Sequence, residues 1–439
     1  MRRPERSSFR CPACVLALGL VVAVAIGCAG PPSVTPTSAP STSASAGKTA
    51  EARKAAETKR PAEPTEGRVA TRLPGAQQPV RATAETIIEG LKLPAAMTFA
   101  PDGRLFFVEV NAGRIRVAQG QRLQDEPFAT LPVQQAAESG LLGLALDPDF
   151  AQNRWVYAYY SEADSESPKR GVRNRVVRFT DRDGIGAELT PILGDLPVNP
   201  KGGVLAHQGG ALGFGPDGKL YLSIGDTGKS KGRVAQDPSS LSGKILRVNR
   251  DGSTPGDNPF PNSPIFALGF RNPWGLTFHP RTGAPFATEN GNVSHDEINL
   301  VRPGGNYGWP LVEGVKHDAK FVDPVWDSGE GRRSRHGMVG LTFYSGTMFP
   351  ELQDELLFCT FNDGILHRAQ LALPEYDQVQ AMSDLANDCR LGVTVGPDGA
   401  IYVASITQIR RLVPAGRRRV GNAVGRTACA LRRAWPIAD

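Results

Sequence analysis

The sequence predicts an all-β fold, because one hairpin pattern recurs along the chain and long helical periodicity is absent. An apolar strand, a turn of the Pro-Asp-Gly kind and a second apolar strand return six times between residues 95 and 412, roughly every 55 residues. The copies occupy residues 97–110, 144–160, 212–226, 276–290, 341–361 and 393–405. Such spacing is typical of blades that close around an axis. We therefore predict a six-bladed β-propeller over residues 82–413, since a pair of β-sandwiches would not explain six similar hairpins.

Turn chemistry explains each hairpin, and a third strand follows most of them. Pro sets φ at the first central position of a turn and Gly takes the positive φ that comes after it, as in Pro216-Asp217-Gly218. Further strands of alternating or apolar character are expected at residues 113–119, 174–180, 243–249, 296–301, 365–371 and 408–413. Units of three or four strands are what a propeller blade requires.

Residues 1–27 predict a signal peptide. A basic stretch through Arg10 precedes an apolar run of 15 residues, Ala13 to Gly27, which is too short for a comfortable transmembrane helix. The run ends in the string AIGC at residues 25–28, which resembles the lipobox of bacterial lipoproteins. Cleavage there would leave a lipid anchor on Cys28, whereas in a plain secretory signal this Cys would be incidental. We expect an extracytoplasmic protein of the cell envelope, facing the periplasm or the cell surface.

The two ends of the mature chain differ in composition from its body. Residues 28–81 predict a disordered linker, since Pro, Ser, Thr, Ala and Gly dominate its first part and cannot form a core. The formal net charge is +6, but the basic residues are concentrated at the ends and residues 82–409 are net acidic. This distribution argues against a nucleic-acid-binding core. The basic tail, residues 414–439, is either a disordered appendage or a segment that rests on an anionic membrane or envelope polymer.

Three cysteines follow Cys28 in the sequence. Cys359 and Cys389 lie beside predicted strands, so outside the cytoplasm they either pair as a disulfide or remain as two buried thiols. Cys429 lies in the basic tail, where it has no evident partner.

His207 and Asp226 flank the third hairpin and form the first candidate for chemistry. The usual hydrolase, zinc-protease and P-loop signatures are absent from the sequence. An Asp across a hairpin can hydrogen-bond one ring nitrogen of a His and leave the other free to take a proton near neutral pH. The alternative is a histidine with no role beyond its turn.

Two further loops carry polar residues. Arg271-Asn272 places a cation and an amide at a predicted strand start, where they can hold an anionic or quinonoid oxygen or only form a salt bridge and a turn. Residues 288–297 pack Asn, Gly and carboxylates densely, which suits a hard cation such as Ca²⁺, although EF-hand spacing is absent. The turn at residues 304–310 carries two aromatic rings that either face a sugar or pack the blade.

Five ordered strings together resemble the glucose/sorbosone dehydrogenase family, soluble sugar dehydrogenases that use pyrroloquinoline quinone (PQQ). They are SGLLGLALDPDF (139–150), HQGGALGFGPDGKLYLSIGDTG (207–228), GKILRVNRDGSTPGDNPF (243–260), GFRNPWGLTFHP (269–280) and DEINLVRPGGNYGWP (296–310). The resemblance covers residues 90–412 and is strongest over 139–310. It implies a six-bladed propeller, in agreement with the repeat count, and the oxidation of an aldose-type sugar with PQQ and Ca²⁺.

The resemblance also implies roles for individual residues. His207 would take the proton of the sugar's anomeric hydroxyl, and Asp226 would hold the correct tautomer of His207. Hydride would pass to the quinone, which Ca²⁺ and Arg271 beside Asn272 would polarise. The further cofactor positions are Glu138, near the substrate, and Arg390.

The metal positions that the resemblance implies are Gly291, Asn292, Asp296, Glu297 and Tyr307. The first two would ligate the cofactor calcium through backbone carbonyls, and the other three would help to hold a second, structural calcium. The sequence departs from the family at Ala206, where an Asp is usual, and no late Lys stands near Gly364. Arg390 is alone where two Arg would pair the cofactor carboxylates, and the cations that would replace the missing ones are Arg332, Arg333 and Arg335.

Two other functions compete with the dehydrogenase. A non-catalytic, calcium-containing propeller that binds a sugar or protein ligand would keep the scaffold without redox chemistry, and the missing basic residues favour it. A hydrolytic propeller such as a lactonase would need a carboxylate-rich metal centre on the axis, which the sequence does not plainly offer. The natural electron acceptor and the sugar itself are not indicated by any motif.

Overall fold

The computed structural model describes residues 80–136, 138–167, 171–198, 207–331 and 336–416. The chain divides into two units, Met1–Ala70 and Thr71–Asp439, and every described residue belongs to the second. The predicted signal peptide, the predicted lipid-anchored Cys28 and nearly all of the predicted linker lie outside the described residues, as do residues 417–439 of the tail. In the described ranges no helix is long and apolar enough to cross a bilayer.

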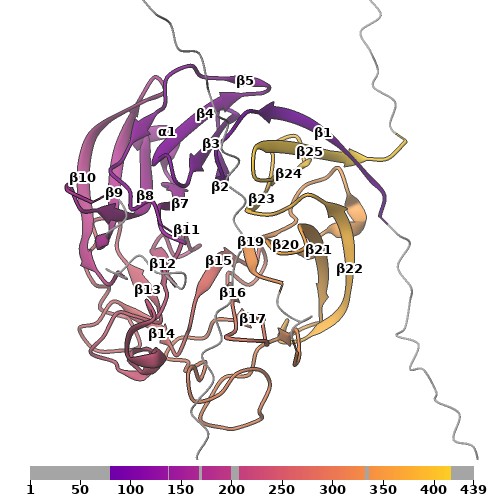
Figure 1. Cartoon of the computed structure of the whole chain (residues 1–439). Helices are drawn as coiled ribbons and strands as arrows, with labels where there is room; N and C mark the ends of the chain where they lie inside the picture. Colours follow the sequence, from indigo (N-terminus) through magenta and orange to yellow (C-terminus); the bar gives the residue numbers. More distant parts are fainter. Residues whose placement is uncertain (1–79, 137, 168–170, 199–206, 332–335, 417–439) are drawn as a thin grey trace, which may run out of the picture. The chain divides into compact units, whose positions relative to one another are not determined.

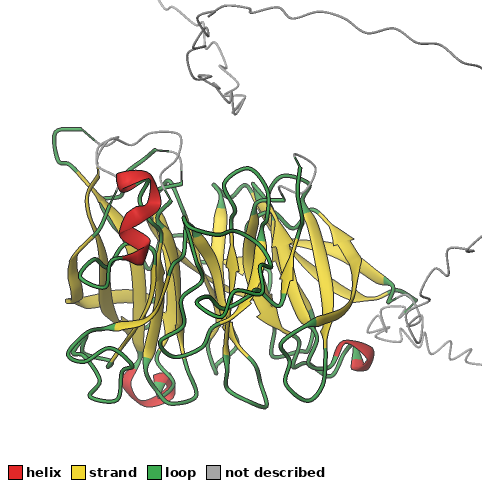
Figure 2. Ribbon diagram, turned by 90° about the horizontal axis from the view of Figure 1, so that it is seen from below, coloured by secondary structure: helices red, strands yellow, loops and turns green. Residues whose placement is uncertain are grey.

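Six antiparallel sheets confirm the predicted six-bladed propeller (Figures 1 and 2). The first blade contains β2 (Pro94–Phe99), β3 (Arg104–Glu109), β4 (Arg114–Gln119), β5 (Arg122–Leu123) and β6 (Ala129–Thr130); the second contains β7 (Leu141–Leu146), β8 (Trp155–Ala163), β9 (Gly171–Arg182) and β10 (Ile185–Leu196). The third contains β11 (Gly209–Phe214), β12 (Leu220–Ile224), β13 (Lys244–Val248) and β14 (Ile265–Leu268); the fourth contains β15 (Pro273–Phe278), β16 (Pro285–Glu289), β17 (Glu297–Leu300) and β18 (Trp326–Asp327).

The last two blades complete the ring. The fifth contains β19 (Met338–Phe343), β20 (Leu356–Thr360), β21 (Ile365–Leu371) and β22 (Val379–Asn387); the sixth contains β23 (Gly392–Val395), β24 (Ile401–Ala404), β25 (Gln408–Pro414) and β1 (Ala82–Glu89). The helices given for the described residues are short: α1 (Phe150–Asn153) and the 3₁₀ segments η1 (Lys229–Gln236) and η3 (Pro350–Leu352). Figure 2 shows the strands standing in upright blades.

The ring closes through its innermost strands and through one strand from the start of the domain. β2, β7, β11, β15, β19 and β23 contact one another in sequence order, and β23 returns to β2. β1 pairs antiparallel with β25, from Ala82 opposite Pro414 to Glu89 opposite Gln408, so the two ends of the propeller share one sheet (Figure 1). Gly143 allows close packing near the axis, because a Cβ there would lie 2.2 Å from the carbonyl oxygen of Gly210.

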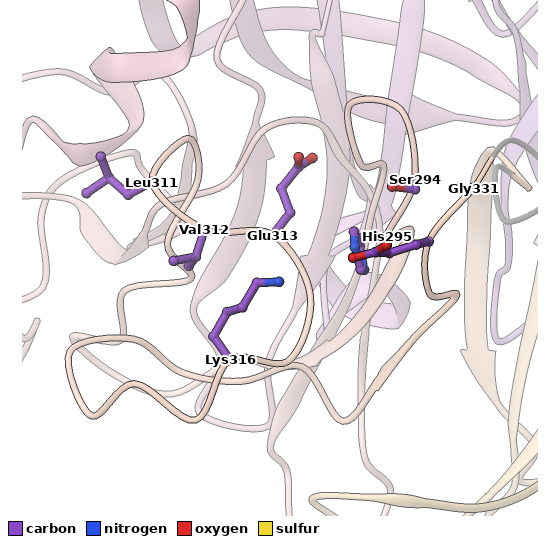
Figure 3. Close-up of a pocket in the computed structure, with 8 residues that line it drawn as sticks. Ser294, His295, Leu311, Val312, Glu313, Lys316 and Gly331 are labelled. Carbon is purple, nitrogen blue, oxygen red and sulfur yellow. The ribbon is translucent and has the colours of Figure 1, made fainter. Parts of the chain in front are cut away.

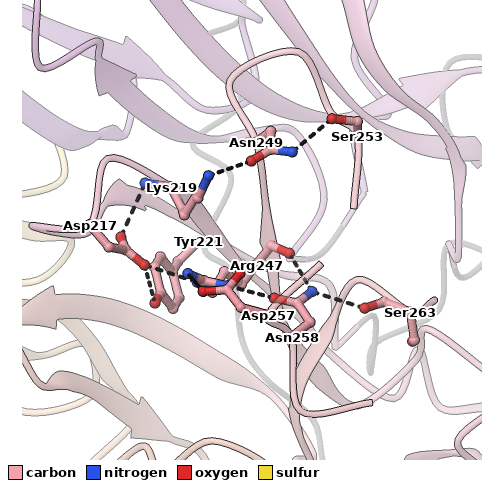
Figure 4. A network of polar contacts seen from close by, with 9 residues as sticks. All are labelled: Asp217, Lys219, Tyr221, Arg247, Asn249, Ser253, Asp257, Asn258 and Ser263. Atoms are coloured by element: carbon pink, nitrogen blue, oxygen red, sulfur yellow. Dashed lines mark hydrogen bonds and ion pairs between the residues drawn. The ribbon is translucent and has the colours of Figure 1, made fainter. Parts of the chain in front are cut away.

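The Asp of the Pro-Asp-Gly turn connects its hairpin to the third strand of the blade through hydrogen bonds (Figure 4). In the third blade the hydroxyl of Tyr221 donates to Asp217 Oδ2 at 3.0 Å, and Arg247 Nε donates to the same oxygen at 2.9 Å. Arg247 also donates to Asp257 Oδ1 at 2.8 Å. The sixth blade repeats the arrangement with Asp398, Tyr402 and Arg411. The repeated motif therefore provides an interstrand network as well as a turn.

The structure pairs Cys359 with Cys389, which resolves the alternative that the sequence left open. Cys359 lies in β20 and Cys389 lies in the loop before β23, with 5.2 Å between their Cα atoms. Both residues are fully buried in one apolar cluster. The disulfide therefore links the fifth blade to the sixth.

Candidate active site

The candidate site lies where the innermost strands of the second, third and fourth blades begin. Each blade starts with its innermost strand, so the residues just before β7, β11 and β15 reach the same end of the axis. Glu138, His207 and Asn272 occupy these three positions, and Glu138 contacts both of the others directly. We call this end of the ring the site face.

His207 and Asp226 lie side by side at the site face. β11 and β12 are antiparallel neighbours in which Gly209 pairs with Ile224, so the residues just beyond this pair meet. His207 Nδ1 lies 2.7 Å from Asp226 Oδ1, and the two side chains are only 6% and 2% exposed. Gly225 permits the approach, because a Cβ at this position would lie 2.0 Å from the carbonyl oxygen of His207. The structure thus brings together the two residues that the sequence places across the hairpin.

Three donors stabilise the carboxylate of Asp226. Gly228 N donates to Oδ1 at 2.7 Å, and Trp309 Nε1 donates to Oδ2 at 2.8 Å. Burial by itself raises the pKa of the Asp226 carboxyl, but the hydrogen bonds from His207, Gly228 and Trp309 outweigh burial and hold this pKa below its ordinary value. An ionised Asp226 keeps the ring proton of neutral His207 on Nδ1. Nε2 of His207 is buried and has no hydrogen-bond partner among the described residues.

Glu138 joins the loops of three blades through one oxygen atom. Its Oε2 accepts from the backbone N of His207 at 3.1 Å and from Asn272 Nδ2 at 2.9 Å. Asn272 Oδ1 in turn accepts from the backbone N of Gly209 at 3.2 Å. These contacts fix the third and fourth blades against the second at the site face.

Glu289 holds the backbone of Arg271 and Asn272 in place. The two Glu289 oxygens accept from the backbone N atoms of Arg271 at 2.9 Å and Asn272 at 2.5 Å. The guanidinium of Arg271 donates from Nη1 to the carbonyl of Asn290 at 2.8 Å, and its Cζ lies 5.5 Å from the ring centroid of Trp309. Arg271 is 4% exposed, and its Nε lacks a partner within the described ranges. The site therefore offers a buried N–H donor as well as the free ring nitrogen of the histidine.

Glu289 and Glu297 are buried carboxylates beside a small cavity that Gly291 and Tyr307 also line. Burial raises the pKa of Glu289 well above its ordinary value, and the charge of Glu297 adds to this effect. Burial also raises the pKa of Glu297, to about 7, against the hydrogen bonds that it accepts. The cavity has room for about one water molecule or one small ion. Since a hard cation would favour both ionised carboxylates, the surroundings fit Ca²⁺.

The predicted metal positions do not all face this cavity. Asp296 Oδ2 accepts from the backbone N atoms of His336 at 2.6 Å and Gly337 at 2.9 Å, and its Oδ1 accepts from Gly291 N at 3.0 Å. Asp296 thus holds the loop before β19. Asn292 lies at the surface, where its backbone N donates to Glu313.

The hydroxyl of Tyr307 is engaged by backbone groups and is not free to ligate a cation. The hydroxyl donates to the carbonyl of Leu300 at 2.6 Å and accepts from Arg302 N at 2.8 Å, while the ring stacks on Phe270. Across the described ranges, no three His, Cys, Asp or Glu side chains are grouped to hold a metal ion. A cation beside Glu297 would therefore need backbone carbonyls among its ligands.

Arg390 lies at the start of the sixth blade and is committed to backbone acceptors. Its Nη1 donates to the carbonyl oxygens of Phe361 and Asn362, in the loop after β20. No contact in the described structure joins Arg390 to His207 or Arg271. The alternative cations Arg332, Arg333 and Arg335 lie outside the described residues.

Two features of the site face were not found from the sequence. An open pocket of about 410 Å³ adjoins the small cavity, and its lining residues are Ser294, His295, Leu311, Val312, Glu313, Lys316, Glu330 and Gly331 (Figure 3). Another His–Asp pair, His336 and Asp363, has 2.9 Å between Nδ1 and Oδ2. His336 lies two residues before β19, as His207 lies two residues before β11, so alignment of the repeats is the signal that would have found it.

Trp309 is a further residue whose part in the site only the structure reveals. The sequence leaves open whether the aromatic rings of the turn at residues 304–310 face a sugar or pack the blade. The indole N–H of Trp309 donates to Asp226, and the indole ring lies under the guanidinium of Arg271. Neither contact is one of the two alternatives. Together they connect the histidine pair to the arginine.

Comparison with known proteins gives a consistent result. The sequence profile of the glucose/sorbosone dehydrogenase family matches residues 91–413. An aldose sugar dehydrogenase of Escherichia coli is 28% identical over 341 residues, which are 74% of this chain and 90% of the relative. Quinoprotein glucose dehydrogenase B of Acinetobacter calcoaceticus is 34% identical over 270 residues, 54% of each chain. The PQQ-bound aldose sugar dehydrogenase of Streptomyces coelicolor superposes with a TM-score of 0.64 at 27% identity, covering 76% of this chain and 99% of that one.

Proposed function

This chain belongs to the glucose/sorbosone dehydrogenase family, and from that premise we propose that it oxidises an aldose-type sugar with PQQ as its cofactor and His207 as general base. Its relatives make it an oxidoreductase of the sugar dehydrogenase kind. The observation that carries the chemical proposal is the free Nε2 of His207, a buried acceptor behind which Asp226 fixes the Nδ1 proton.

His207 takes the hydroxyl proton in this scheme. Oxidation of a sugar at its anomeric carbon breaks the O–H and C–H bonds: the hydroxyl proton goes to Nε2, and the hydrogen on carbon leaves with its electron pair. The imidazolium that forms is stabilised by Asp226, 2.7 Å from Nδ1. Transfer to a positioned base contributes about 10²–10⁴-fold to such a reaction.

Arg271 and Asn272 are the residues that would hold the cofactor. PQQ, when bound, supplies the quinone carbonyl that accepts the hydride. The unpartnered Nε of buried Arg271 supports this assignment, because an oxygen-rich anion is the ligand that a fixed guanidinium selects. Glu289 and Glu138 keep the two residues in place by accepting from their backbone and amide groups.

We also propose a Ca²⁺ site at Glu297, completed by backbone carbonyls near Gly291 and Tyr307. Its support is the pair of buried carboxylates, Glu289 and Glu297, which line one small cavity together with Glu313; Arg271 and His295 line the same cavity. A bound cation would offset the cost of burying these charges.

An extracytoplasmic location is part of the proposal. The signal-like residues 1–27 and the lipobox-like string at 25–28 motivate it. The Cys359–Cys389 disulfide supports it independently, because such bonds persist in oxidising compartments.

Reconstitution tests the function directly. Purified protein is mixed with PQQ and Ca²⁺, and reduction of an artificial electron-acceptor dye is followed with a panel of aldoses, alongside thermal unfolding with and without the cofactor. We expect sugar-dependent dye reduction and a cofactor-dependent rise in Tm. If neither occurs, while Ca²⁺ alone raises Tm, the protein is the non-catalytic propeller that the missing basic residues favour.

A further inference from the structure

Trp309 is anchored from several directions before it meets Asp226. Its backbone N donates to the carbonyl of Gly269 at 3.0 Å, and its carbonyl accepts from Gln236 Nε2 at 2.8 Å. Gly232, within η1, packs directly on the indole, since a Cβ on Gly232 would lie 2.3 Å from Trp309 Nε1. The indole N–H is therefore aimed at Asp226 Oδ2 by contacts that do not involve His207.

The chemical nature of the donor matters to the His207–Asp226 pair. An indole N–H only donates and never accepts a proton, so it cannot exchange roles with Asp226 as a hydroxyl or a water could. Its bond to Oδ2 prevents the carboxylate from rotating and leaves Oδ1 for His207 and Gly228. A charge-assisted bond of this kind stabilises the ionised carboxylate and lowers its pull on the Nδ1 proton.

We propose that Trp309 is a positioning residue that sets the basicity of His207 through Asp226 and, by lying under Arg271, joins the proton-accepting pair to the cofactor-binding arginine. The catalytic role of Trp309 in this inference rests on the proposed function. The contacts of Trp309 with Asp226 and Arg271 are those of the cofactor-free protein and do not depend on that function. Three charged groups of the described structure lie around the His207–Asp226 pair: Glu138 accepts from the backbone N of His207, Arg271 lies over the indole of Trp309, and Glu289 accepts from the backbone N of Arg271.

The first test removes the donor and measures the histidine itself. In cofactor-free protein, the ring signals of His207, assigned by comparison with His207→Gln, are titrated by NMR in wild type and Trp309→Phe. Loss of the N–H makes Asp226 more basic, so the pKa of His207 is expected to rise by about 0.5–1 unit. Trp326→Phe is the matched control, because Trp326 lies in β18 against Phe358 and leaves Asp226 untouched.

A shape-preserving variant guards against misfolding. Incorporation of 3-benzothienylalanine at position 309 replaces the indole N–H by sulfur with almost no change of volume, so the packing of Gly232 and Arg271 is kept. It should shift the His207 titration as far as Trp309→Phe does. An unchanged titration in this folded variant overturns the proposal.

Activity provides the second readout and separates the two hypotheses. In reconstituted Trp309→Phe the acid limb of the kcat/KM–pH profile should move to higher pH by the same amount as the His207 titration. A purely structural role for Trp309 would lower kcat without moving that limb. A shifted titration in a protein that never oxidises sugar supports the positioning role and refutes the dehydrogenase. An active enzyme in which neither the titration nor the limb moves refutes the positioning role alone.

Discussion

Glu138 and Asn272 meet at 2.9 Å although 134 residues separate them in the sequence. The contact exists because the innermost strands of the second and fourth blades begin at the same end of the ring, with the third blade between them. The same Glu138 oxygen accepts from the backbone of His207 in that middle blade. One carboxylate therefore fixes the relative positions of the proposed base and of the amide beside Arg271.

Replacement of His207 should abolish most of the activity without unfolding the protein. His207→Gln keeps a polar side chain but removes the base, so kcat/KM with an aldose and PQQ is expected to fall by about 10²–10⁴-fold. Steady-state kinetics measures the loss, and the Tm of the variant reports on folding. Activity within a few fold of wild type would rule out the proposed base.

Truncation of Glu138 should destabilise the site face. Glu138→Ala leaves His207 N and Asn272 Nδ2 without their acceptor, at an expected cost of about 1–3 kcal/mol in the free energy of unfolding. Glu138→Gln retains an acceptor oxygen and should cost less. Urea unfolding of wild type and both variants measures their free energies of unfolding. Equal values for the three proteins would show that the contact does not contribute to stability.

Glu297 should determine the response to Ca²⁺. Addition of millimolar Ca²⁺ to EDTA-treated wild type is expected to raise Tm, and Glu297→Gln should remove most of this rise because it takes away the buried charge beside the cavity. Glu330→Gln, an exposed carboxylate on the same face, serves as the control. A full Ca²⁺ response in Glu297→Gln would place the cation elsewhere.

Lys244 should make stability rise with pH in the alkaline range. Its ammonium is fully buried among the carbonyl oxygens of Val234, Ala235 and Ser242, and burial lowers its pKa to about 8. The unfolded chain keeps this lysine protonated to about pH 10.4, so between these two pKa values the unfolded state binds more protons than the folded state. The penalty of the buried charge is complete below pH 8 and disappears as the pH approaches 10.4.

The measurement compares wild type with Lys244→Met from pH 7.5 to 10.5. The free energy of unfolding of wild type should gain about 3 kcal/mol relative to the variant across this window. The same comparison with Lys320→Met, which removes an exposed lysine, should be flat. An unfolding free-energy difference between wild type and Lys244→Met that does not change with pH would contradict the lowered pKa of Lys244.

Reduction of the disulfide should weaken the closure between the last two blades. Cys359 and Cys389 are 30 residues apart, a separation for which chain entropy predicts about 3–4 kcal/mol of stabilisation. Dithiothreitol should therefore lower the Tm of wild type but leave the Tm of Cys359→Ala/Cys389→Ala unchanged. Equal sensitivity of the two proteins would show that the bond does not form in solution.

The number of blades and the placement of the hairpins were readable from the sequence. The reason is local: Pro-Asp-Gly turns and alternating apolar residues specify a hairpin without help from distant residues. The pairing of His207 with Asp226 was readable for the same reason, because the two residues flank one hairpin and antiparallel pairing brings them together.

Long-range contacts were not readable. The hydrogen bonds of Asp296 to the loop before β19 and of Arg390 to backbone carbonyls of the neighbouring blade were not predicted. Trp309 had two possible roles in the sequence, and its bond to Asp226 crosses 83 positions of the chain. Which side chain satisfies which buried polar atom depends on how the blades close around the axis.

The sequence by itself thus determined the repeating hairpins, the ring that they form and the pairing of His207 with Asp226 across one of them, since each depends on residues close together in the chain. Tertiary structure alone decided which carboxylates are buried beside the small cavity, which of them serve the loops, and which ring supports Asp226. Those outcomes depend on packing between blades, where burial and hydrogen-bond geometry select among residues that look equivalent in the sequence.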